Sequence, residues 1–151
     1  MNPTLGSRAA IFVRAWARKI KGLLMFLNHL DLHVPDVAAT ADFFVRYFGL
    51  TIVATRANGA LTILSDGGRL ELVLSHAVPA FGSTDQSQSG LVSYHIGFIV
   101  ADRATVDATH AAMAGDGVEV RAPREMRGGC LFYCHAPGHV LVEVGARELF
   151  A

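Results

Sequence analysis

The sequence predicts an α+β fold made of two tandem βαβββ modules. Three observations support this prediction. Two histidine-containing strand segments begin alike, an aspartate and a helical stretch follow each of them, and three short apolar segments follow each helix. When His29 is placed over His95, Asp36 falls over Asp102. Since one module has too little core to be stable alone, we expect the two to form a curled mixed sheet around a trough, with the helices outside.

One folded domain is expected from residue 25 to 151, with modules at about 26–76 and 91–147. Residues 1–24 carry basic side chains and no acidic one, so they form a basic N-terminal extension. Their apolar residues recur at helical spacing, which is typical of a helix that lies on a membrane or a partner. An extension with little role is the favoured interpretation.

In the first module, a helix is predicted from Val37 to Phe48, because Asp36 is a typical N-cap and Gly49 a typical stop. Three strands are predicted after it, at 51–57, 60–65 and 69–75. The Asn58-Gly59 pair between the first two indicates a hairpin. The expected apolar face of the helix consists of Val37, Ala41, Phe44, Val45 and Phe48.

The second module repeats this order. A helix from Arg103 to Ala114 is predicted after Asp102, and the segment "GDG" ends it. Strands are expected at 118–122, 130–134 and 140–145. A connector rich in Gly, Ser and Gln, near residues 81–90, joins the two modules.

Composition excludes several classes of function. Without residues 1–24 the chain has no lysine, and eight basic against thirteen acidic residues give it a formal charge of −5. This balance argues against nucleic-acid binding, and no apolar run is long enough to span a membrane. Cys130 and Cys134 would lie roughly 13 Å apart on a strand, too far for a disulfide. Reduced thiols fit a cytoplasmic protein.

Each module places a histidine in its first strand and a glutamate in its last: His29 with Glu71, and His95 with Glu143. Strand alternation puts both glutamates opposite runs of Leu or Val, so their carboxylates are expected to point into the trough. A lone strand histidine is more often a hydrogen-bonded core residue, but here four polar residues recur in pairs. Two imidazoles and two carboxylates suit a divalent metal such as Zn, Fe, Ni, Mn or Co.

The segments "NHLDLHVPD", "RLELVL", "YHIGFIVAD" and "FYCHAPGHVLVEVG" resemble the vicinal oxygen chelate superfamily. This superfamily includes glyoxalase I, methylmalonyl-CoA epimerase, extradiol dioxygenases, fosfomycin resistance enzymes and bleomycin resistance proteins. The resemblance covers residues 26–147. Members usually have a D-P-D-G turn with a ligand glutamate six residues after the proline. Pro137 and Glu143 keep this spacing, whereas His139 stands where glycine is usual.

The resemblance implies one divalent metal ion per site, held by His29, Glu71, His95 and Glu143. It implies a lyase or isomerase of the glyoxalase type, acting on a small oxygenated metabolite through a metal-stabilised oxyanion, with Glu71 or Glu143 as the base. Tyr133 matches a tyrosine that lines the pocket in some branches. Related chains often complete each site across two subunits, which implies a homodimer.

Two alternatives remain open. An Fe(II) extradiol-type dioxygenase would use His29, His95 and Glu143 and leave Glu71 incidental. A metal-free protein of the bleomycin-resistance kind would hold a ligand in the same trough. His33 and Ser75 replace the Arg and Asn usual in glutathione-using members, which argues against a glutathione adduct. His33 and Asp31 are either partners of the site or a polar strand end.

Overall fold

A computed structural model of the chain describes residues 27–81, 94–126 and 128–147. The predicted basic extension at 1–24 and most of the predicted connector lie outside these residues. In the first module, β1 (His29–His33) leads into α2 (Val37–Phe48), and β2 (Thr51–Arg56), β3 (Leu61–Ser65) and β4 (Glu71–Ser75) follow. In the second, β5 (Ile96–Ile99) leads into α3 (Arg103–Gly115), β6 (Arg124–Met126), β7 (Gly129–Ala136) and β8 (Val140–Ala146).

The predicted fold class is confirmed: each module forms one four-stranded mixed sheet. The strand orders are β1-β4-β3-β2 and β5-β8-β7-β6, so the first and last strands of each module pair in parallel. The same topology twice supports the internal repeat. Within the described residues the two sheets share no hydrogen-bonded strand pair, so they remain separate layers instead of one continuous sheet.

Both helices begin as their caps predict. The Asp36 carboxylate accepts a hydrogen bond from the Ala39 N–H at 2.9 Å, and the Asp102 carboxylate accepts one from the Thr105 N–H at 2.8 Å. Gly49 ends α2 with φ of 66°, a left-handed conformation that favours glycine. Local capping chemistry therefore fixes where the helices start, and in the first module where the helix stops.

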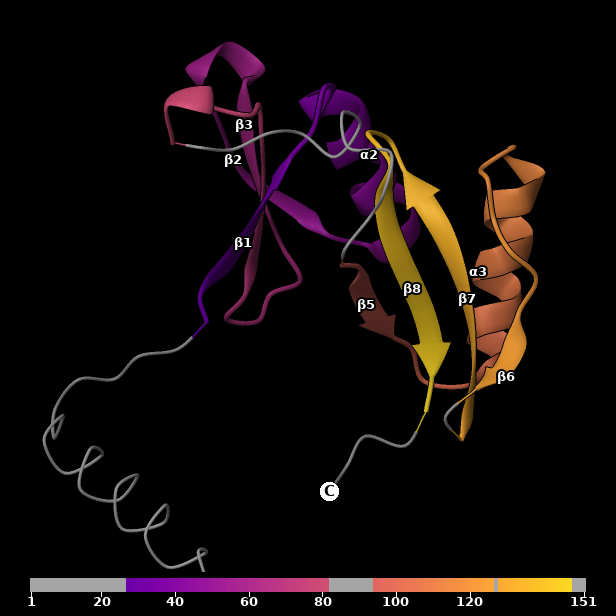
Figure 1. Ribbon diagram of the computed structural model, residues 1–151. Helices are drawn as coiled ribbons and strands as arrows, with labels where there is room; N and C mark the ends of the chain where they lie inside the picture. The colour runs from indigo at the N-terminus through magenta and orange to yellow at the C-terminus, as the bar shows by residue number, and fades with distance from the viewer. Residues whose placement is uncertain (1–26, 82–93, 127, 148–151) are drawn as a thin grey trace, which may run out of the picture.

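The position of α2 differs from the expected outer location. Figure 1 shows α2 between the first sheet and the second module, whereas α3 covers the far side of β7. The ring of Phe48 stacks on Phe98 of β5 with centroids 4.0 Å apart, and the Tyr47 hydroxyl donates to Asp116 at 2.8 Å. On the same helix Phe43, which the predicted apolar face omitted, is buried, whereas Val45 is exposed.

One predicted strand is displaced along the chain. Residues 118–122 form only a single bridge, from Val120 to Cys134, and the regular strand β6 begins at Arg124. Pro123 lies between the two segments and has no N–H to donate to a strand ladder. The hairpin predicted at Asn58-Gly59 is confirmed: β2 and β3 pair in antiparallel fashion, and a short 3₁₀ turn, η1 (Ala57–Gly59), joins them.

A single apolar core joins the modules. It contains Leu72 and Leu74 of β4 and Val140, Val142 and Val144 of β8, which are the residues that alternate with the two glutamates. The glutamates therefore lie on the sheet faces opposite the core. None of the described helices is both long and apolar enough to cross a bilayer.

Candidate functional site

The second module brings three predicted site residues together. Tyr133 of β7 lies directly opposite Glu143 of β8, and its hydroxyl donates a hydrogen bond of 2.6 Å to Glu143 Oε2. The Nε2 atom of His95 lies 3.4 Å from the same oxygen, and its ring stands edge-on to that of Tyr133. One carboxylate oxygen is thus the common neighbour of a phenol and an imidazole.

Glu143 is buried, with 2% of its surface exposed, which is unusual for a glutamate on the face opposite the core. A buried carboxylate is costly unless donors satisfy it. Tyr133 and His95 lie against Oε2, and Arg147 Nη1 lies 3.8 Å from Oε1. Arg147 was not identified from the sequence, because a basic residue just after a strand has no distinguishing pattern.

The first module contributes a more open pair. His29 of β1 is directly opposite Glu71 of β4 in the parallel register. His29 is exposed, and its Nδ1 atom lies 3.3 Å from the side-chain oxygen of Asn28. An imidazole and a carboxylate on adjacent strands of one sheet face can contact a common ligand. Neither His29 nor Glu71 is buried, however, in contrast to Glu143.

The two glutamates do not occupy equivalent positions in the repeat. The Val34 N–H donates to the Ser75 carbonyl, and the Val100 N–H donates to that of Gly145, which fixes how the modules correspond. By this register Glu143 corresponds to Val73, two residues after Glu71. The carboxylates share a face but are displaced by one step along the strand, which sequence spacing alone did not reveal.

The four predicted ligands do not form one cluster within a single chain. Among residues 27–81, 94–126 and 128–147, no three His, Cys, Asp or Glu side chains lie close enough to hold a metal ion. The predicted ligands therefore lie in two pairs, His29 with Glu71 and His95 with Glu143, and each pair is called a half-site. Each half-site offers one nitrogen and one oxygen donor.

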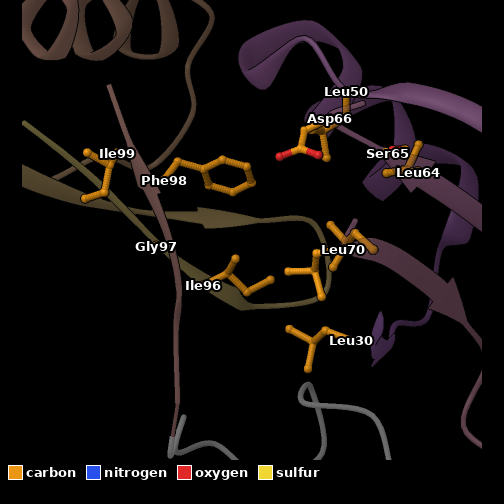
Figure 2. A pocket seen from close by; sticks show the side chains of 11 residues that line it. Leu30, Leu50, Leu64, Ser65, Asp66, Leu70, Ile96, Gly97, Phe98 and Ile99 are labelled. Carbon is orange, nitrogen blue, oxygen red and sulfur yellow. The ribbon is translucent and has the colours of Figure 1, made fainter. Parts of the chain in front are cut away.

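Two further features bear on function. An apolar cleft of about 260 Å³ lies between the modules, where Figure 2 shows Ile96 and Phe98 facing Leu30 and Leu70. A second cavity, of about 560 Å³, is lined by Asp31, His33, Ser75 and His76 beside apolar side chains. The sequence placed Asp31 and His33 on the face of His29, but it gave no indication that Ser75 links them.

Two other features concern the second module. Cys134 packs in the core, and burial raises the pKa of its thiol to about 12, so the reactive thiolate form is disfavoured. His139, which stands where relatives usually have glycine, adopts a left-handed conformation with φ of 61°. The turn before Glu143 therefore holds a non-glycine residue in a conformation that favours glycine.

Comparisons with known proteins agree with this fold. The sequence model of the Glyoxalase/Bleomycin resistance protein/Dioxygenase superfamily matches residues 26–144. A solved structure described as that of a possible glyoxalase from Bacillus cereus is 30% identical, with a TM-score of 0.67, covering 80% of this chain and 98% of that one. Lactoylglutathione lyase from Agrobacterium tumefaciens is 22% identical, with a TM-score of 0.63, covering 83% and 95%. An uncharacterized protein of Pseudomonas aeruginosa is 27% identical over 72% of this chain and 77% of its own length.

Proposed function

The chain belongs to the Glyoxalase/Bleomycin resistance protein/Dioxygenase superfamily, and on that premise we propose that it is a divalent-metal-dependent lyase or isomerase acting on a small oxygenated metabolite. One observation carries the proposal. The buried carboxylate of Glu143 meets the imidazole of His95 and the hydroxyl of Tyr133 on the sheet face opposite the core. A buried acid with a proton donor and a nitrogen ligand beside it is an arrangement suited to catalysis.

The proposed metal ligands are His29, Glu71, His95 and Glu143. The donor set fits a divalent ion such as Zn, Ni, Co, Mn or Fe, because imidazole and carboxylate together suit these metals. The 3.4 Å between His95 Nε2 and Glu143 Oε2 supports a shared ligand for this pair. A metal bound there would act as a Lewis acid towards oxygen atoms of the substrate.

The chain's own residues would move the proton. Glu143 is the proposed base. Its Oε2 atom would take a proton from a carbon of the substrate and return it to a neighbouring atom of the substrate, so that no electrons are gained or lost. Tyr133 holds Oε2 through its 2.6 Å hydrogen bond and keeps the carboxylate directed. Glu71, on the open half-site, is the second candidate for the base.

We further propose that two copies of the chain complete each site. His29 with Glu71 supplies two donors and His95 with Glu143 supplies two, while the described part of one chain gathers no group of three. In a twofold homodimer, the first half-site of one copy can face the second half-site of the other, twice. The two buried, free cysteines fit a reducing compartment, so a cytoplasmic location is proposed.

The first experiment is elemental analysis of protein purified without chelators or a metal-affinity tag. We expect near-stoichiometric divalent metal in the native chain and its loss in His95→Ala. His110→Ala is the control, because His110 lies on α3 and packs on Phe132, on the face of β7 opposite Tyr133 and Glu143. If the native chain contains no metal and takes up none of the candidate ions, the proposal fails and a metal-free ligand-binding protein is the better account.

A dioxygenase is the second candidate, and the register of the glutamates favours it. Because Glu71 is displaced by two residues from the equivalent of Glu143, a three-ligand site of His29, His95 and Glu143 is a coherent alternative. The test is oxygen consumption with catechols. Turnover supported only by ferrous iron, and unchanged in Glu71→Gln, would favour ring cleavage over isomerisation.

A further inference from the structure

The cavity of about 560 Å³ lies on the sheet face that carries His29, between β1, β4 and the turn η1. Its polar lining consists of Asp31, His33, Ser75 and His76, and the rest is apolar, including Ala57 and Leu61. A volume of this size is typical of small-molecule sites in proteins. Among the described residues that line the cavity there is no lysine or arginine.

Hydrogen bonding fixes which nitrogen of His33 carries the proton. The Ser75 hydroxyl donates to Asp31 Oδ1 at 2.8 Å, so its single hydrogen is already used. The Nδ1 atom of His33 lies 3.1 Å from the same hydroxyl oxygen and must therefore donate to it. In the neutral imidazole, Nε2 is then unprotonated and can only accept a hydrogen bond.

His76 reaches the same state by a different contact. Its Nδ1 atom lies 3.1 Å from the backbone carbonyl oxygen of Val34, which is an acceptor and cannot donate. Nδ1 must carry the proton, so Nε2 of neutral His76 is also an acceptor. The Asp31 carboxylate, about one-third exposed, adds a negatively charged acceptor between the strands.

We infer that this cavity binds the end of a ligand that donates hydrogen bonds and carries no negative charge, namely a protonated amine or a hydroxyl group attached to an apolar body. His33, His76 and Asp31 all present acceptors, and the described lining contains no lysine or arginine that could balance the charge of a carboxylate or phosphate. The inference deepens the proposed function by giving the chemistry of the substrate's distal end. Its tests use neither metal nor turnover, so their failure leaves the metal proposal standing.

The ring protonation can be measured directly by nitrogen-15 NMR of the histidines in the full-length chain at neutral to mildly alkaline pH. His33→Gln and His76→Gln identify the two signals by their loss. We expect both rings as the Nδ1–H form, and we expect Ser75→Ala to convert His33 to a mixture while His76 is unchanged. Finding both rings as the Nε2–H form would overturn the inference.

Ligand chemistry can be tested with three probes of nearly equal size: benzylamine, benzyl alcohol and benzoate. Because a hydrogen bond to a charged group contributes about 1.5–3 kcal/mol, benzylamine should bind at least about tenfold more tightly than benzoate. Benzyl alcohol should also bind more tightly than benzoate. Calorimetric titration of the native chain, with and without a chelator, gives the affinities.

The variant Asp31→Asn separates the amine from the hydroxyl. The affinity for benzylamine should fall about tenfold, since a charge-assisted hydrogen bond is lost, and the affinity for benzyl alcohol should change little. Asp42→Asn, an exposed position on α2, is the matched control and should change neither affinity. Benzoate binding as tightly as benzylamine, or no binding by any of the three probes, would show that the cavity is not such a site.

Discussion

The phenol of Tyr133 and the carboxylate of Glu143 lie directly opposite each other on β7 and β8, joined by a hydrogen bond of 2.6 Å. This cross-strand pair connects the stability of the second module to the chemistry proposed for it. Glu143 is almost completely buried, so the pair satisfies a group that would otherwise destabilise the folded state.

Replacing Tyr133 by Phe should therefore destabilise the protein. We expect the free energy of unfolding to fall by about 1–3 kcal/mol, because a buried carboxylate loses a hydrogen-bond donor. Tyr94→Phe is the control, since Tyr94 is exposed, and should change the unfolding free energy by less than about 0.5 kcal/mol. Urea denaturation measures both; equal values for the two variants would mean that the Tyr133 hydroxyl contributes nothing.

The two glutamates should differ in their effect on metal binding. Glu143→Gln keeps the shape of the side chain but removes its charge, so we expect loss of activity and of most metal affinity. Glu71→Gln should lower the affinity for the metal if the site has four protein ligands, and should leave it unchanged if the site has three. Metal titration of both variants distinguishes these sites, and full retention of affinity and activity in Glu143→Gln contradicts either one.

A shared site predicts complementation between inactive variants. His29→Ala and His95→Ala each damage every site in their own homodimers. After the two are unfolded and refolded together, half of the dimers are mixed and each mixed dimer has one intact site, so roughly a quarter of the native metal content should return. Refolding each variant alone is the control. No recovery in the mixture would place the complete site within one chain.

Gly129 should not tolerate a side chain. A Cβ atom there would lie 2.1 Å from the Ala146 carbonyl oxygen of β8, and the backbone of a paired strand cannot move away cheaply. We expect Gly129→Ala to cost at least about 2 kcal/mol of stability. Gly115→Ala, at the end of α3 with nothing within 4 Å, should instead stabilise by about 0.4–1 kcal/mol. Thermal unfolding compares them, and similar shifts in both would contradict the crowding at Gly129.

Alkaline conditions should weaken the fold through Cys134. Burial raises the pKa of this thiol from 9.0 to about 12, so between these values the unfolded chain is ionised while the folded chain is not. Stability should thus be fully present below pH 9 and fall by about 1.4 kcal/mol per pH unit above it, from this thiol alone. In Cys134→Ala the decline should be shallower. Denaturant unfolding of the native chain and of Cys134→Ala at pH 8 to 11 measures the two declines. If the unfolding free energy falls equally with pH in both, ionisation of Cys134 is not the cause.

The elements were largely predictable because their signals are local. Asp36 and Gly49 bound α2 by capping chemistry, and β8 follows from the alternation of Val140, Val142 and Val144 around Glu143. The displaced β6 shows where local signals mislead. Residues 118–122 alternate like a strand, and the Arg121 N–H does donate to the Tyr133 carbonyl and the His135 N–H to that of Glu119. Pro123, which has no N–H, interrupts the ladder after them.

The site was predictable only in part. The pairing of His95 and Tyr133 with Glu143 required the fold, since the sequence gives the face of a strand but not which side chains meet across strands. The register of the glutamates and the chain from Asp31 through Ser75 to His33 depend on how β1 pairs with β4. The spacing of apolar residues, with a period of two in strands and 3.6 in helices, does not give the pairing register of two strands.

The sequence by itself determined the repeat, the order of strands and helices, and the sheet face on which His29, Glu71 and Glu143 lie, because strand alternation and helix caps act within a few residues. Only the tertiary structure decided how the sheets of the two modules are arranged relative to each other. Phe48 stacks on Phe98 and α2 lies between the modules, whereas the described strands of the two sheets do not pair with each other. Packing of one aromatic helix face therefore joins the described halves of the chain. The two half-sites are consequently built by separate sheets.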